Sequence, residues 1–167
     1  MKLRILLISV LILTLFVIVV PQGMRELKAV LTGYDEVPAV STTGRGEFQA
    51  RISRDESSIS YELSYSNLEG TTTSASHIHF GQKDVNGGVS AFLCGGGGKP
   101  ACPPITGTIS GTITASDVIG PAGQGIAAGE LDELIQAMRA GKTYVNVHTD
   151  KHPGGEIRGQ LGPGRGN

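Results

Sequence analysis

Residues 105–114 read Ile-Thr-Gly-Thr-Ile-Ser-Gly-Thr-Ile-Thr, so apolar or glycine positions alternate strictly with hydroxyl-bearing ones. Successive side chains of a β-strand point to opposite faces, and this pattern therefore predicts a strand with one apolar and one polar face. Ile105, Ile109 and Ile113 are expected on the apolar face. From this stretch we expect the chain to be rich in β-strands.

Segments with a similar pattern lie on both sides of this stretch, separated by turns rich in glycine, proline and small polar residues. The further expected strands span residues 28–32, 47–52, 59–65, 75–80, 143–149 and 156–161. The segment 81–104 is rich in glycine and proline and is expected to be a loop. This spacing predicts an all-β fold, a Greek-key-like β-sandwich or flattened barrel of about eight strands.

One short helix is expected to interrupt the β pattern, over residues 130–140. Apolar side chains recur there at spacings of three and four, at Leu131, Leu134, Ile135 and Met138. Acidic residues crowd the start of this segment, Arg139 lies near its end, and Gly141 is a natural C-terminal cap. We expect the apolar stripe of the helix to pack against the core.

Composition bounds the class of protein. The chain has 167 residues and a net charge of −1, and its basic residues form no cluster. Nucleic-acid binding is therefore not expected. About 145 residues remain after the N-terminal segment, enough for one compact domain with a core. The last residues, 162–167, are expected to form a disordered tail.

Residues 1–23 have the pattern of a segment directed to a membrane. Lys2 and Arg4 precede an apolar run over residues 5–20. This arrangement is typical of a secretory signal peptide, and its length also suits an N-terminal membrane anchor that stays uncleaved. Both alternatives place the domain outside the cytoplasm, where it would be secreted, periplasmic or on the cell surface. The membrane would be contacted only through this segment.

The two cysteines, Cys94 and Cys102, flank a glycine-rich segment. In an exported protein, a nearby pair of this kind is most simply a disulfide. A cysteine-based metal site is the alternative, and an oxidising compartment disfavours it. We therefore expect a disulfide that closes a short loop.

All four histidines fall in two short clusters, with His77 and His79 in the first and His148 and His152 in the second. Two residues that are two positions apart on a strand point to the same face. With Ile78 in the core, both imidazoles of the first cluster are expected on the outer face, shielded by the glycine-rich loop. The two clusters together would make a three- or four-nitrogen site suited to copper or zinc. His152 precedes a proline in a turn and is the weakest candidate.

The simpler alternative is that these histidines form ordinary surface hydrogen bonds. The nearby carboxylates Asp84, Asp150 and Glu156 are expected in solvated loops or beside a ligand, and not on a metal ion. Arg158 is expected to point outward, either as an ion-pair partner of Glu156 or as a residue that guides a small anion. No serine lies in the strand–turn–helix context of a nucleophilic triad.

Several motifs resemble those of the CHRD domain, first named in chordin. They are His77-Ile78-His79-Phe80-Gly81, Gly107-Thr108-Ile109-Ser110-Gly111-Thr112-Ile113, Tyr144-Val145-Asn146-Val147-His148-Thr149 and His152-Pro153-Gly154-Gly155-Glu156-Ile157-Arg158-Gly159-Gln160. The opening Leu31-Thr32-Gly33 with Glu36-Val37-Pro38 fits the same family. The resemblance covers residues 27–161 and implies an extracellular β-domain. Chordin itself binds growth factors, a partner class that does not suit a small stand-alone chain.

A second resemblance, to the copper-binding strand of Cu/Zn superoxide dismutases, rests on His77, His79 and Gly81. Those enzymes are Greek-key barrels with a disulfide-tied loop and an arginine beside the copper. The resemblance implies a copper ion, with zinc as the alternative, and Arg158 as the guide for superoxide or another small anion. No histidine lies between His79 and His148, so the bridging ligand and the zinc site of those enzymes have no counterpart.

Two functional hypotheses follow. The first is an extracytoplasmic copper protein that has superoxide dismutase-like redox activity if a coordination position stays open. The second is a non-enzymatic extracellular protein-binding module without a metal.

Overall fold

The structure is a computed structural model that describes residues 24–164. The predicted leader over residues 1–23 lies outside this part of the chain, as do residues 165–167 of the predicted tail. Within the described part, no helix is both long enough and apolar enough to cross a membrane.

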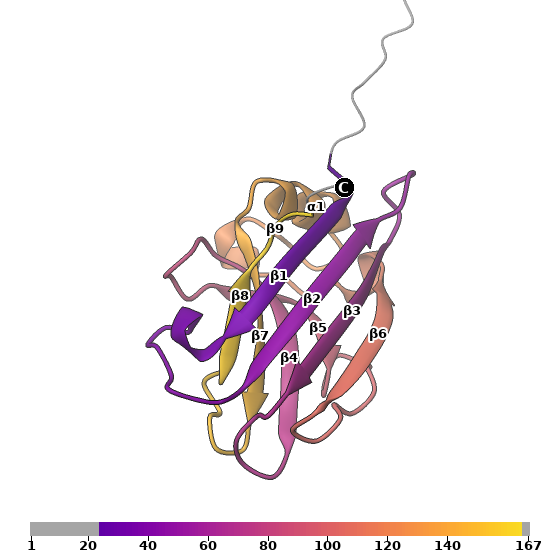
Figure 1. Cartoon of the computed structure of the whole chain (residues 1–167). Coiled ribbons are helices and arrows are strands. Elements are labelled where there is room, and N and C mark those ends of the chain that lie inside the picture. The colour runs from indigo at the N-terminus through magenta and orange to yellow at the C-terminus, as the bar shows by residue number, and fades with distance from the viewer. Residues whose placement is uncertain (1–23, 165–167) are drawn as a thin grey trace, which may run out of the picture.

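Nine strands make up the described fold (Figure 1). They are β1 (Glu26–Thr32), β2 (Arg45–Ile52), β3 (Ile59–Ser66), β4 (Thr73–Phe80), β5 (Gly88–Cys94), β6 (Gly107–Ile113), β7 (Thr143–Thr149), β8 (Ile157–Gln160) and β9 (Gly162–Pro163). The helical elements of the same part are α1 (Leu131–Arg139) and the short 3-10 helices η1 (Gly33–Asp35), η2 (Ala115–Asp117) and η3 (Ala122–Gln124). Gly162–Pro163, expected in the tail, pairs with β1.

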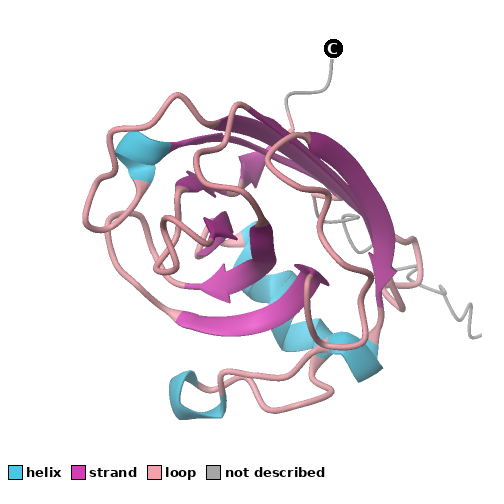
Figure 2. Ribbon diagram, turned by 90° about the horizontal axis from the view of Figure 1, so that it is seen from below, coloured by secondary structure: helices cyan, strands magenta, loops and turns pink. Residues whose placement is uncertain are grey.

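The strands belong to one antiparallel sheet that curls into a flattened barrel. Neighbouring strands follow the order β5-β4-β7-β8-β1-β2-β3-β6, and β9 adds to β1. Figure 2 shows the strands curving around a common interior. The hydroxyl of Tyr61 on β3 donates a hydrogen bond of 2.8 Å to the carbonyl oxygen of Leu93 on β5, across that interior. The predicted all-β fold with one short α-helix is confirmed.

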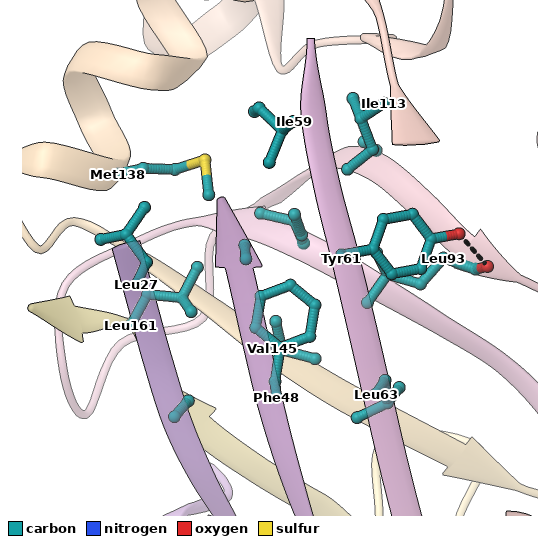
Figure 3. Packing of buried hydrophobic residues seen from close by; sticks show 14 of the residues in the cluster. Leu27, Phe48, Ile59, Tyr61, Leu63, Leu93, Ile113, Met138, Val145 and Leu161 are labelled. Carbon is teal, nitrogen blue, oxygen red and sulfur yellow. Dashed lines mark hydrogen bonds between the residues drawn. The ribbon is translucent and has the colours of Figure 1, made fainter. Parts of the chain in front are cut away.

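Alternation decides which side chains of the strands enter the interior. Every second residue of β2 is buried, as is every second residue in the first part of β3. Phe48, Tyr61 and Leu63 from these strands meet in the core (Figure 3). Helix α1 lies at one end of the barrel, its predicted apolar stripe is buried, and Met138 points toward Leu27. The opposite face of β1, β2 and β3 is left to solvent.

The prediction that residues 81–104 form only a loop is wrong, because β5 lies within this segment and pairs with β4. The pairing shifts register twice, between Ser76 and His77 and between Ile78 and His79. These irregularities leave β5 without the regular alternation that identifies a strand in a sequence. The predicted disulfide between Cys94 and Cys102 is confirmed, and it ties the end of β5 to the loop that follows.

Candidate metal centre

Three of the four histidines converge on one face of β4 and β7. His77 and His79 lie two positions apart on β4, and His148 lies on β7, which pairs with β4. Each contributes a ring nitrogen that lies within 4.8 Å of the other two. The structure therefore brings His148 next to the pair His77 and His79, although at least 69 positions separate it from them in the sequence. The hypothesis of one site built from two histidine clusters requires this.

His77 and His79 lie on the face of β4 opposite the core residue Ile78, as expected, and this face is almost fully buried. Their exposed fractions are only 9 % and 8 %. The ring of His79 stacks on Tyr144 with centroids 4.7 Å apart, and the edge of His77 meets Phe92 at 4.5 Å. The face opposite the barrel core is therefore a second buried layer, covered by rings and loops.

Part of the cover of this layer comes from the glycine- and proline-rich segment 81–104, as expected. Gly96 and Gly97 pack against the ring of Phe92, which in turn contacts His77. The segment between β4 and β5 covers His79 directly, because the carbonyl oxygen of Gly87 lies 2.9 Å from His79 Nδ1. The first part of the glycine- and proline-rich segment 81–104 therefore forms one wall of the site.

Hydrogen bonds to carbonyl groups fix the tautomers of two histidines. Only a protonated nitrogen can bond to a carbonyl oxygen, so His79 Nδ1 donates to Gly87 and His148 Nδ1 donates to Pro153 at 3.0 Å. The lone pair of each neutral ring then lies on Nε2. His79 Nε2 is buried and has no hydrogen-bond partner among the described residues. His148 Nε2 accepts a hydrogen bond of 3.1 Å from Nδ1 of His77.

The three imidazoles are neutral at pH 7. Burial is the main cause that lowers the pKa of His77 from 6.5 to about 3, and the charges of His148 and His79 lower it further. Burial likewise lowers the pKa of His79 from 6.5 to about 4. The pKa of His148 is also lowered by burial. Neutral imidazole is the form that ligates a metal ion, so the site needs no deprotonation before binding.

A buried carboxylate anchors the turn that carries Pro153. Glu156 is fully buried, and its oxygens accept hydrogen bonds from Thr42 Oγ1 at 2.6 Å, Glu69 N at 2.8 Å and Thr149 Oγ1 at 2.7 Å. Thr149 Oγ1 in turn accepts from the backbone N–H of His152. Glu156 therefore does not lie in a solvated loop, and it holds the turn to which His148 is bonded.

The fourth histidine lies outside the group of three. His152 Nε2 lies 3.5 Å from a carboxylate oxygen of Glu69. Asp150 accepts hydrogen bonds from Thr71 and Thr72, which lower its pKa to about 2, and Asp84 is exposed. No carboxylate joins the three histidines within residues 24–164.

Arg158 lies in the same layer as the histidines, as expected, but it is buried there. It is 2 % exposed, and its guanidinium carbon lies 3.4 Å above the ring of Tyr144. The guanidinium donates to Asn86 Oδ1 at 3.2 Å and to the carbonyl oxygens of Gln82 at 3.3 Å and Val85 at 2.8 Å. No ion pair joins it to Glu156 in the part of the chain that the structure describes. Arg158 therefore holds the segment that covers His79.

Two further buried residues of the site had no role assigned from the sequence. Asn146 is 3 % exposed, and its Oδ1 lies 3.1 Å from His148 Nε2. Glu36 is 6 % exposed, and burial raises the pKa of its carboxyl group, although the Val37 N–H, Arg158 and Asn146 oppose that rise. Asn146 shares its strand face with His148, which is a usable sequence signal. Glu36 comes from a distant loop and carries no such signal.

The comparisons with known proteins identify a family. The model of the CHRD domain family matches residues 27–161. No curated protein matches the chain.

Proposed function

The chain belongs to the CHRD domain family, and we propose that its domain binds one copper ion through His77, His79 and His148. The observation that carries this proposal is the buried Nε2 of His79, which has no hydrogen-bond partner among the described residues. A buried polar nitrogen without a partner is costly, and a metal ion that takes its lone pair removes that cost.

The spacing of the nitrogens supports a shared ion. Two nitrogens that each lie 2.0–2.1 Å from one ion at a tetrahedral angle are separated by about 3.3 Å. His77 Nδ1 and His148 Nε2 are 3.1 Å apart, close to this value. The ligand atoms of the three histidines all lie within 4.8 Å of one another, so His79 lies near enough to join the other two around one ion.

The donor set favours copper. Neutral imidazoles suit copper and zinc, whereas magnesium and calcium prefer oxygen ligands. At a site made of nitrogens, affinity for divalent first-row ions is highest for copper and lower for zinc. Zinc remains the alternative metal, and the experiment below includes it.

Redox activity is a separate extension of this proposal. If a coordination position of the copper stays open, the ion would cycle between its oxidation states and dismutate superoxide. Arg158 would then attract the anion through the electric field of its charge and not by direct contact. Its guanidinium is buried, and it donates hydrogen bonds to residues 82–86. The measurement is superoxide consumption by the copper-loaded protein, and its failure would remove this extension without touching copper binding.

The alternative function is a metal-free, extracellular protein-binding module. The hydrogen bonds of His79 and His148 to carbonyl groups favour it, since structural histidines form the same bonds.

Both functions are proposed for a domain outside the cytoplasm, either released or tethered by residues 1–23. The Cys94–Cys102 disulfide supports that location, because such bonds persist in oxidising compartments. Mass spectrometry of the mature N-terminus after cell fractionation tests it.

The test uses protein purified without a histidine tag. We expect one equivalent of copper in elemental analysis after loading, and tighter binding of Cu(II) than of Zn(II). The variants His77→Gln, His79→Gln and His148→Gln should each weaken copper binding by a hundredfold or more, on the order expected for loss of a ligand. His152→Gln is the matched control and should bind as the parent does. Unfolding curves without metal verify that each variant folds.

The result that defeats the copper proposal is equally specific. It is wild-type protein that binds copper no more tightly than the His79→Gln variant does. The metal-free binding module would then be the better account of the domain.

A further inference from the structure

Asn146 has an unusual set of neighbours for an amide side chain. It is the cross-strand partner of His77, and it lies two positions before His148 on the same face of β7. Its Oδ1 lies 3.1 Å from His148 Nε2, the same distance that separates His77 Nδ1 from this nitrogen. The amide oxygen of Asn146 is therefore as close to His148 Nε2 as the ring nitrogen of His77 is, a distance that suits two ligands of one metal ion.

The contact between Asn146 and His148 places two acceptors against each other. His148 Nδ1 carries the proton that bonds to Pro153, so the neutral ring presents a lone pair at Nε2. The carbonyl oxygen of the amide also presents only lone pairs. Two lone pairs at 3.1 Å repel unless a cation or a proton lies between them.

Rotating the amide by half a turn would remove this repulsion, but the other side of the side chain opposes that rotation. Glu36 Oε1 and Asn146 Nδ2 lie 2.3 Å and 3.0 Å from the point where a Cβ on Gly155 would stand, so the carboxylate and the NH₂ group face a common space. Glu36 Oε1 is buried and otherwise accepts no hydrogen bond among the described residues. The carboxylate attracts the NH₂ group and repels a carbonyl oxygen, so Oδ1 stays directed at the histidines.

We propose that Oδ1 of Asn146 is the fourth ligand of the copper ion, and that Glu36 is the positioning residue that directs it there. This inference rests on the proposed copper site. It gives the ion a coordination shell of three nitrogens and one neutral oxygen, drawn from β4 and β7 alone. The carboxylate of Glu36 lies beside the NH₂ group of Asn146, outside this coordination shell, and its negative charge partly offsets the charge of the ion. In many metal sites a carboxylate orients a histidine ligand, and here a carboxylate orients an amide ligand.

Gly155 belongs to the same arrangement. A side chain at this position would place its Cβ 2.3 Å from Glu36 Oε1, so the carboxylate would have to leave the space that it shares with the amide. The motifs Glu36-Val37-Pro38 and His152-Pro153-Gly154-Gly155 are distant in the sequence. The proposal gives both a common role in orienting Asn146.

The experiment compares Cu(II) affinity and electron paramagnetic resonance spectra of the full chain and three site variants. Asn146→Leu removes the oxygen, and we expect binding tenfold to a hundredfold weaker, with three nitrogens still coupled to the copper. Asn146→Asp replaces the neutral oxygen with an anionic one, and we expect binding at least as tight as in the parent, with altered g and hyperfine values. Glu36→Gln keeps the shape but removes the charge, and binding should weaken about tenfold.

Gln160→Leu is the matched control. Gln160 is also an amide, on the neighbouring strand β8, but it donates to the carbonyl oxygens of Gly81 and Gly141. Its loss should leave copper affinity and the spectrum unchanged. If Asn146→Leu and Asn146→Asp both give the affinity and spectrum of the parent, the amide is not a ligand, while the three-histidine site stands. Absence of copper binding in the parent overturns both proposals. Asn146→Asp keeps the test decisive if Asn146→Leu does not fold.

Discussion

At the residue scale, the two ring nitrogens of His79 have different partners. Nδ1 donates to the carbonyl oxygen of Gly87 at 2.9 Å, and this bond fixes the orientation of the ring. Nε2 is buried without a hydrogen-bond partner among the described residues. A histidine that served only the fold would be expected to satisfy both nitrogens or to expose one of them. One nitrogen is therefore committed to structure and the other is free for a ligand.

The pH dependence of copper binding follows from these buried rings. A proton competes with copper for each imidazole below its pKa, and three exposed imidazoles with a pKa of about 6.5 would weaken binding about fiftyfold between pH 7.4 and 6.0. Burial lowers the pKa of His77 to about 3 and of His79 to about 4, and it lowers that of His148 as well. We therefore expect the dissociation constant at pH 6.0 to stay within about twofold of that at pH 7.4. Competition with a chelator measures it, and a fiftyfold loss would mean that the rings are solvated.

At the element scale, the segment between β4 and β5 decides whether the site is buried. It reaches His79 through Gly87, and Arg158 on β8 holds it through Gln82, Val85 and Asn86. The guanidinium is packed on Tyr144, which stacks in turn on His79. The wall of the site is thus attached to the strands that carry the ligands.

Removing the guanidinium should loosen this wall. Arg158→Met keeps an unbranched apolar side chain over Tyr144 but loses three hydrogen bonds from a charged donor, so we expect a loss of about 2 kcal/mol or more in the free energy of unfolding. Backbone amides of residues 82–87 should exchange faster with deuterium. Arg51→Met, at an exposed position of β2, is the control and should change stability by less than about 0.5 kcal/mol. Unchanged exchange in the segment would show that Arg158 does not hold it.

The turn between β7 and β8 offers a matched pair of glycines. Gly155 has a φ of +122°, and an added Cβ would stand 2.3 Å from Glu36 Oε1, whereas a Cβ on Gly154 would meet nothing within 4 Å. Gly155→Ala should therefore cost about 2 kcal/mol or more of stability and weaken copper binding. Gly154→Ala should leave both nearly unchanged. Chemical unfolding and copper titration of the two variants provide the comparison, and equal behaviour would remove Gly155 from the account.

At the scale of the whole molecule, the sequence predicts what depends on local periodicity. Strand β7 has the predicted bounds, and α1 lies one residue inside the predicted range at each end. The sequence predicts a shield over His77 and His79, but the contacts that complete their burial, with Phe92, Tyr144 and Gly87, are tertiary and carry no periodic pattern. The role of Glu36 also depends on a tertiary contact, with a turn more than 100 positions away. Strand β5 escaped prediction because its pairing with β4 is irregular.

The disulfide should contribute to the stability of the whole domain. Cys94 and Cys102 are separated by 8 positions, and closing a loop of this size lowers the entropy of the unfolded chain by an amount worth about 2–3 kcal/mol. The double variant Cys94→Ser with Cys102→Ser should lose stability of this order in urea unfolding while keeping the strand content in circular dichroism. An unchanged unfolding midpoint would mean that the bond constrains little.

Anomalous diffraction at the copper edge, from crystals of the copper-loaded protein without a tag, tests the central claim most directly. The account predicts one strong peak about 2.0–2.1 Å from ring nitrogens of His77, His79 and His148, inside the layer beneath the segment that Arg158 holds. A peak beside His152 and Glu69 alone, or no ordered peak at all, would contradict it.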